Sequence, residues 1–317
     1  MKKYIIMCMA VVALLFASCK NEDISISREV SFDINPKSVV IGFTEDFWGD
    51  IADIPSDGML RTRLLIYNAD GQLIQSTQQD LSGYDDHMSA TVQLPDGAYR
   101  AIVITDIARN NTNIPEYWTL SGENDLSSMK LYKAGYITKF NMLGIANLQF
   151  TVEVGSPKEY TINVEPAGTL LLCIVYGIHH YDEIGIQYYE LLTNRTSESC
   201  AFNSDGTWKY SIKNSNFENR FAVFYSQDYN YGGYFYDFEL PLGNTSLKWT
   251  ADGEVDVTNK MDVAMKAGEE YEFVLDLDEG TYNWGVINGG KGSSFRKDGG
   301  EMKEIVFEDY LDYKETK

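Results

Sequence analysis

Apolar and polar residues alternate along much of the chain. The clearest segment is 147–154, in which Leu148, Phe150, Val152 and Val154 alternate with Asn, Gln, Thr and Glu. A period of two residues predicts a β-strand with one buried face. The other segments that we predict as strands are 63–67, 72–74, 91–93, 101–104, 160–164, 170–176, 208–212, 221–225, 234–240 and 271–277.

Turn sequences separate these strands. Residues 68–71 read Asn-Ala-Asp-Gly and join the first two predicted strands, which is a hairpin signature with glycine in the left-handed position. Residues 94–99 contain Pro-Asp-Gly and join the next pair. Segments 110–136 and 178–194 show no clean alternation, and each is predicted as a short helix or a long crossing loop. Successive hairpins favour a mostly β chain of β-sandwiches over a βαβ arrangement.

The N-terminus has the parts of a signal peptide. Lys2 and Lys3 precede an uncharged, mostly apolar run at 4–17, which is followed by Ser18 and Cys19. The run is shorter than the about 20 residues that a membrane-spanning helix needs. Small residues before a cysteine resemble the lipobox of bacterial lipoproteins, which implies cleavage after Ser18 and lipidation of Cys19. An ordinary secreted protein is the alternative.

The predicted organisation has five parts. In chain order these are a signal peptide at 1–18, a lipidated linker at 19–27, an N-terminal β-sandwich at 28–157, a C-terminal β-sandwich at 158–288, and a Gly-rich linker with a C-terminal strand or tail at 289–317. The boundary between the sandwiches is placed by a Gly and Pro cluster at 155–159. The same cluster could equally form one more hairpin turn.

The chain is strongly acidic, with 26 basic and 47 acidic residues and a formal net charge of -21. Nucleic acid is therefore excluded as a partner, because its binding depends on Lys and Arg contacts to phosphates. Anionic lipid and anionic polysaccharide would be repelled for the same reason. Attachment to a membrane would then depend on the lipid on Cys19.

The sequence contains few residues of the kinds that catalyse reactions. Of its 3 His, His179 and His180 are adjacent and would point to opposite faces of a strand. There is no Gly-x-Ser-x-Gly elbow, no His-Glu-x-x-His motif and no EF-hand loop. The chain is therefore predicted not to be an enzyme, and we predict no cofactor and no metal ligands.

Two cysteines remain after the predicted signal peptide and the lipidated Cys19. An even pair in an oxidising compartment allows a disulfide between Cys173 and Cys200. Cys173 lies in the apolar segment 170–176, so the alternative is that it is a buried small hydrophobe. The spacing of the two residues does not choose between these interpretations.

The layout of the chain resembles the fimbrillin-like and FimB-type fimbrial anchor lipoproteins of Bacteroidales. The resemblance rests on Cys19 followed by a polar stretch and on the motifs LLIYNADGQLI, LPDGAYRAIVI, FTVEV, YTINVEPAGTLLLCIVYG and KAGEEYEFVLDL. It implies two tandem transthyretin-like β-sandwich domains in a surface-exposed protein held in the outer membrane by lipid. Glu22 and Asp23 are similar to the signal that exports such lipoproteins to the outer face; a solvated linker is the alternative.

The resemblance also implies a function in fimbriae, as an anchor or minor subunit whose partners are fimbrial shaft or accessory subunits. Assembly would use strand addition, in which an extended segment of one subunit completes a sheet of the next. Ile305, Phe307 and Leu311 lie in a strand-like tail after the Gly-rich segment 289–300, and they form the candidate donor strand. The alternative is that this tail is the last strand of its own domain.

Aromatic residues around 230–233 suggest a different function. Tyr229, Tyr231 and Tyr234 could form a platform on which sugar rings stack, which would make the chain a cell-surface glycan-binding lipoprotein. The alternative interpretation is that alternating aromatic residues of two strands fill a sandwich core.

Overall fold

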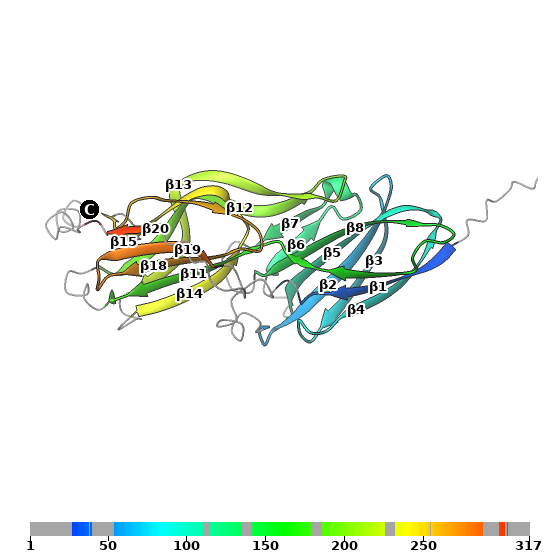
Figure 1. Cartoon of the computed structure of the whole chain (residues 1–317), viewed down its shortest axis with the longest axis horizontal. Helices are drawn as coiled ribbons and strands as arrows, with labels where there is room; N and C mark the ends of the chain where they lie inside the picture. Colours follow the sequence, from blue (N-terminus) through cyan, green and yellow to red (C-terminus); the bar gives the residue numbers. More distant parts are fainter. Residues whose placement is uncertain are drawn as a thin grey trace, which may run out of the picture.

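The structure is a computed structural model that describes residues 27–37, 39, 54–110, 115–134, 141–178, 186–225, 232–253, 255–287, 298–301 and 303. Almost all regular structure in these residues is β-strand, which confirms the predicted mostly β class. The molecule is elongated, with β1 (Ser27–Asn35) near one end of the long axis and β20 (Asp298–Glu301) near the other (Figure 1). No helix in the described residues is long and apolar enough to cross a membrane.

Two sheets pack face to face in the first half of the molecule. A three-stranded sheet has the order β4-β1-β9, and a five-stranded sheet has the order β10-β8-β5-β2-β3. The strands are β2 (Gly58–Asn68), β3 (Leu73–Leu81), β4 (Met88–Pro95), β5 (Gly97–Arg109), β8 (Leu143–Val152), β9 (Glu159–Asn163) and β10 (Glu165–Pro166). Every second residue of β4 is buried, as the alternation of its sequence requires. Phe32, Val103 and Phe150 lie in the core between the sheets.

The second half is also built from two sheets. One has the order β14-β11-β18-β19-β20, and the other has the order β16-β15-β12-β7-β6, with β13 paired to β12 and β17 to β15. The strands are β6 (Trp118–Ser121), β7 (Lys130–Lys133), β11 (Thr169–Tyr176), β12 (Tyr188–Phe202), β13 (Trp208–Tyr225), β14 (Gly232–Glu239), β15 (Gly243–Ala251), β16 (Val255–Asp256), β17 (Met261–Met265), β18 (Glu270–Asp276) and β19 (Thr281–Ile287). Tyr189, Trp249 and Phe273 lie in its core.

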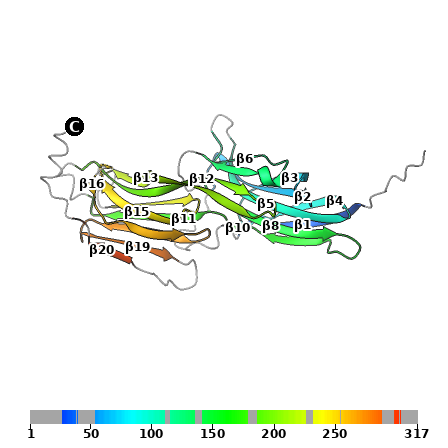
Figure 2. The same cartoon turned by 90° about the horizontal axis from the view of Figure 1, so that it is seen from above.

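A third apolar cluster joins the two halves. Tyr67 and Ile104, on the outer face of the five-stranded sheet, pack with Trp118 of β6, Leu131 of β7 and Phe202 of β12. Strand β12 runs between the halves (Figure 2), because one part of it pairs with β15 and another part with β7. The two halves therefore share both a core and a strand.

The strands expected from alternation are present. The predicted segment 147–154 lies on β8 as far as Val152, whereas Val154, expected on the buried face, lies beyond the strand and is exposed. The predicted segment 170–176 falls on β11. The predictions at 208–212 and 221–225 are the two ends of a single strand, β13. The prediction for 110–136 needs correction in its described part, which contains β6, the 3-10 turn η2 (Leu126–Ser128) and β7.

Two short strands pair across the domain boundary predicted at 157. Strand β9, which follows the predicted boundary at 157, pairs in parallel with β1. Strand β7, which precedes that boundary, pairs with β12. The domain limits proposed from the sequence stay predictions.

Candidate functional site

A groove of about 750 Å³ lies where β7, β12 and β13 meet the end of β14. It is lined by residues 132–134, by Arg195, Thr196 and Glu198, by residues 218–223 and by Glu239. We refer to it as the central groove. Its walls come from the consecutive strands β12, β13 and β14 and from β7, which lies far from them in sequence, so the fold of the second half creates it.

Two stretches of backbone border the central groove without a neighbouring strand in the described part of the chain. Strand β15 pairs with β12 at residues 189–193 and β7 pairs with it at 199–201, so 194–198 has no strand partner on that side. Strand β13 pairs with β12 along one edge and with no other described strand. All residues from 218 to 223 of β13 line the groove.

A bulge in β13 precedes this edge. Residues 215–218 fall outside the β12–β13 ladder, where the register shifts. Phe217 within the bulge has φ 57°, a left-handed conformation that is unusual for an aromatic residue. The ammonium groups of Lys248 and Lys260 lie 5.1 and 4.9 Å from the centre of its ring, which favours this conformation through cation–π attraction. The bulge redirects the strand into the groove wall.

One end of the central groove holds a buried ion pair. The side chains of Lys133 and Glu239 are 9% and 4% exposed. The Lys133 ammonium donates to both carboxylate oxygens of Glu239, at 2.6 Å for Oε2. Glu239 Oε1 also accepts from the backbone amide of Leu240 at 2.8 Å. Each buried charge is therefore compensated, and this end presents no net charge to a ligand.

A second ion pair lies on the β12–β13 ladder. Arg220 Nε is 2.7 Å from Glu190 Oε2, and the Glu190 side chain is almost fully buried. Burial raises the pKa of Glu190 above its ordinary value, and the attraction of Arg220 opposes this only in part. The side chain of Arg220 is 55% exposed and lines the groove, so it can also contact a ligand there.

The lining of the central groove contains no Ser, Cys or His, so it holds no Ser–His or Cys–His pair. In the described residues, no group of three or more His, Cys, Asp and Glu side chains could hold a metal ion. Its charges are balanced, with the basic residues Lys133, Arg195 and Arg220 facing the acidic residues Glu198, Glu218 and Glu239. An extended segment without a large net charge therefore fits best.

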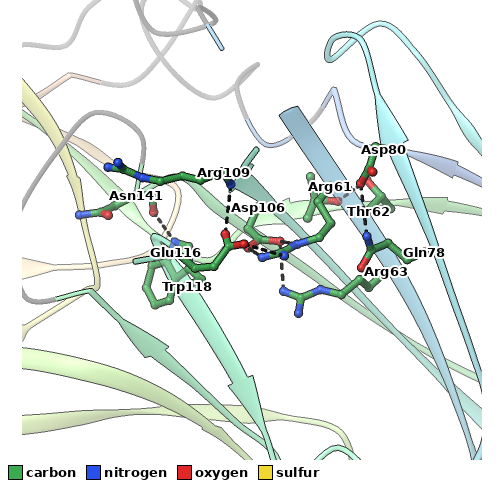
Figure 3. Close-up of polar contacts among 11 residues, drawn as sticks. Arg61, Thr62, Arg63, Gln78, Asp80, Asp106, Arg109, Glu116, Trp118 and Asn141 are labelled. Atoms are coloured by element: carbon green, nitrogen blue, oxygen red, sulfur yellow. Dashed lines mark hydrogen bonds and ion pairs between the residues drawn. The ribbon is translucent and has the colours of Figure 1, made fainter. Parts of the chain in front are cut away.

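A separate polar cluster lies on the outer face of the five-stranded sheet (Figure 3). Asp106 of β5 is fully buried and accepts from Arg61 Nη2 at 2.6 Å, from Arg61 Nε at 3.1 Å and from Arg63 Nη2 at 3.0 Å. Glu116 lies 3.6 Å from Arg61. The side chains of both arginines are almost buried, at 13% and 11% exposed, so the cluster is part of the packed interior.

Most of the site residues predicted from the sequence lie outside the described residues. These are Cys19, Tyr229, Tyr231, Ile305, Phe307 and Leu311. Tyr234 lies on β14, where its backbone pairs with Ile174 of β11. The lipid anchor, the donor strand and the sugar platform therefore stay predictions.

No disulfide joins Cys173 to Cys200. Both residues are buried thiols, Cys173 in the core of the second half and Cys200 in the cluster shared by the halves. Burial raises the pKa of the Cys200 thiol to about 12. The structure corrects the disulfide alternative and agrees with the interpretation of Cys173 as a small hydrophobe.

Sequence reasoning misses the central groove. Residues 213–220 of β13 form a polar run between two predicted strands, which is typical of a loop. One signal could have indicated the groove. The predicted strands at 208–212 and 221–225 are separated by only eight residues without Gly or Pro, which is compatible with one long bulged strand. The pairing of this segment with β12 depends on tertiary contacts, which the local sequence pattern does not indicate.

No protein-family model matches the chain, and no curated protein matches it. The chain is similar to a solved candidate polysaccharide-binding protein from Bacteroides thetaiotaomicron, with 11% identity, a TM-score of 0.49 and coverage of 87% of this chain and 98% of that chain. It is also similar to a fimbrial assembly protein from Parabacteroides distasonis (13% identity, TM-score 0.42, coverage 83% and 96%). A third structure is the fimbrial anchor protein Mfa2 from Porphyromonas gingivalis (13% identity, TM-score 0.45, coverage 82% and 98%). Similarity at this level assigns no function to the chain.

Proposed function

We propose that the chain is a lipid-anchored outer-membrane subunit of a fimbria, acting as its anchor or as a minor subunit, and that it binds an extended segment of a neighbouring subunit in the central groove. The observation that carries the proposal is the pair of backbone stretches, 194–198 of β12 and 218–223 of β13, that contribute to one groove and each have one edge without a strand partner in the described residues. Unpaired strand edges bind extended peptides through backbone hydrogen bonds.

The size and charge of the groove support a peptide ligand. A strand that paired along 218–223 would extend over roughly 20 Å, at about 3.3 Å per residue. The balanced charges of the lining favour a segment that is apolar on one face and polar on the other. The tail of this chain has that pattern, because Ile305, Phe307 and Leu311 are separated by even numbers of residues and would share one face of a strand.

The position of β1 supports the anchor function. This strand follows the proposed lipid site Cys19 closely in sequence and lies in the half of the molecule opposite β20 (Figure 1). The last described strand, β20, lies near the opposite end. A lipid on Cys19 would therefore hold the first half next to the membrane and direct the C-terminal half toward other subunits.

A crosslinked pull-down tests this function. The tagged chain is recovered from the outer membrane of its native host, and bound proteins are identified by mass spectrometry. We expect fimbrial subunits to be recovered with the unaltered chain. The variant Ala134→Trp, which fills the groove, should recover at least tenfold less, whereas the matched control Ser211→Trp, on β13 outside the groove lining, should recover the same amount.

Two outcomes would contradict the proposal. Equal recovery with Ala134→Trp and with Ser211→Trp would show that the central groove is not the binding site. Recovery of glycan-uptake proteins in place of fimbrial subunits would reject the fimbrial function itself.

A further inference from the structure

Strand β3 presents a second, unrelated backbone edge on the first half of the molecule. It is the last strand of the five-stranded sheet and pairs only with β2 among the described strands. Ile74 is 48% exposed, and the side chains that follow it as far as Asp80 are half-buried or exposed. The strand therefore meets solvent at its edge as well as on its faces.

The sequence of β3 is polar on both faces from Gln75 to Asp80. Gln75 pairs with Ile66, and Thr77 pairs with Leu64, so both polar side chains are on the face that carries the core. The facing sheet has three strands against five. From Leu73 to Asp80 no side chain of β3 is fully buried, so packing specifies the register of this strand only weakly.

Natural proteins protect long edge strands with lysine, proline, bulges or covering loops. The sequence of β3 contains neither Lys nor Pro, and Asp80 is its one charged residue. A register shift lies only at its start, where the Leu73 amide also donates to the carbonyl of Asn124 at 3.1 Å. From Gln75 to Leu81, no described element covers the edge.

We propose that β3 pairs with β3 of a second copy of the chain, antiparallel and about a two-fold axis at Gln78. This register places Gln75 opposite Leu81, Ser76 opposite Asp80 and Thr77 opposite Gln79, with Gln78 opposite its own equivalent. Each copy offers the same patch, as a two-fold interface requires. The covered start of the strand stays outside the pairing, so Asn124 does not obstruct it.

The charge of the chain favours this patch for self-association. Two copies of net charge -21 repel each other at most contacts. The β3 edge is nearly uncharged, and the proposed register sets Asp80 against Ser76, so no like charges face each other across the two strands. The contact is small, so the dimer belongs to the weak and transient class. Its affinity should rise with salt, because the Debye length falls from about 10 Å at 0.1 M to about 3 Å at 1 M.

A charge-swap experiment tests the two-fold axis. Sedimentation velocity of the unaltered chain should show a dimer that becomes several-fold tighter between 0.1 M and 1 M NaCl. Gln78→Lys and Gln78→Glu should each be monomeric, because two like charges would meet on the axis. An equal mixture of the two variants should recover the dimer, and Ser211→Lys should dimerise like the unaltered chain.

A covalent test uses the distance across the axis. Directly opposite Cβ atoms are about 4.5–5.5 Å apart, so Gln78→Cys should give a disulfide-linked dimer on mild oxidation, and Ser76→Cys, which faces Asp80, should not. A monomer under every salt condition would overturn the proposal. So would a dimer that is indifferent to both charged Gln78 variants, or a mixture that stays monomeric. Ala134→Trp should leave the dimer intact, so a failure of the dimer proposal can be distinguished from a failure of peptide binding in the central groove.

Discussion

The buried arginine cluster gives the sharpest test of how the first half of the molecule is stabilised. In the variant Asp106→Asn, the carboxylate that accepts three hydrogen bonds from Arg61 and Arg63 becomes a neutral amide of the same size. Both guanidiniums remain buried beneath the layer that carries Glu116. Glu116, at 3.6 Å from Arg61, becomes the nearest carboxylate of the cluster.

The expected cost follows from this geometry. Breaking a buried ion pair by removing one partner costs about 3–5 kcal/mol, because the other charge is left uncompensated. Asp106 is fully buried and serves two arginines, so we expect a loss within that range. With roughly 2 °C of melting temperature per kcal/mol for a large chain, the midpoint should fall by about 6–10 °C.

Urea unfolding followed by tryptophan fluorescence measures the loss, and two variants serve as controls. Asp57→Asn removes a half-exposed carboxylate 3.9 Å from Arg109, and it should cost less than about 1 kcal/mol. The triple variant Arg61→Met, Arg63→Met, Asp106→Leu removes the three buried charges together, leaves only the half-exposed Glu116, and should recover most of the stability. A loss below about 1 kcal/mol for Asp106→Asn would refute the account of a compensated buried cluster.

Three further results are expected. Burial raises the pKa of Glu190, so the folded state binds the carboxyl proton more tightly than the unfolded state does. The free energy of unfolding therefore falls as the pH rises above the ordinary carboxyl pKa. In urea titrations, Glu190→Gln should become more stable relative to the parent between pH 4 and pH 7. Cys173 and Cys200 should resist maleimide at pH 8 in the native chain and react only after denaturation, and rapid native labelling would contradict their burial. Gly122 has φ 68° and its Cβ would collide with a backbone oxygen, so Gly122→Ala should cost about 1–3 kcal/mol, whereas Gly83→Ala should be near neutral.

The sequence predicts those parts of the fold whose signals are local. The strand at 147–154 is visible because its own alternation records which face is buried, and the β2–β3 hairpin because the turn chemistry lies within four residues. The central groove has no such signal. Residues 213–220 look like a loop, but β12 pairs with 213, 214, 219 and 220, and the bulge at 215–218 contains Phe217 in its left-handed conformation. The arginine cluster is hidden for a related reason, since Arg61 alternates with core residues as a solvated face would, until β6 and β7 cover that face.

The apolar cluster shared by the two halves determines whether the central groove and the N-terminal end of the molecule are joined rigidly or flexibly. A flexible linker would let the halves move independently, which is the ordinary expectation for domains joined by a small polar interface. Here Tyr67 and Ile104 of the first half are buried against Trp118 and Leu131, and β7 is hydrogen-bonded to β12 beside the groove. Separating the halves would expose this apolar surface at roughly 25 cal/mol per Å² and would also break the strand pairing. A segment bound in the central groove would therefore act on the first half through packed side chains and a continuous β12, so the end of the molecule that carries β1 and the groove wall would move as one unit.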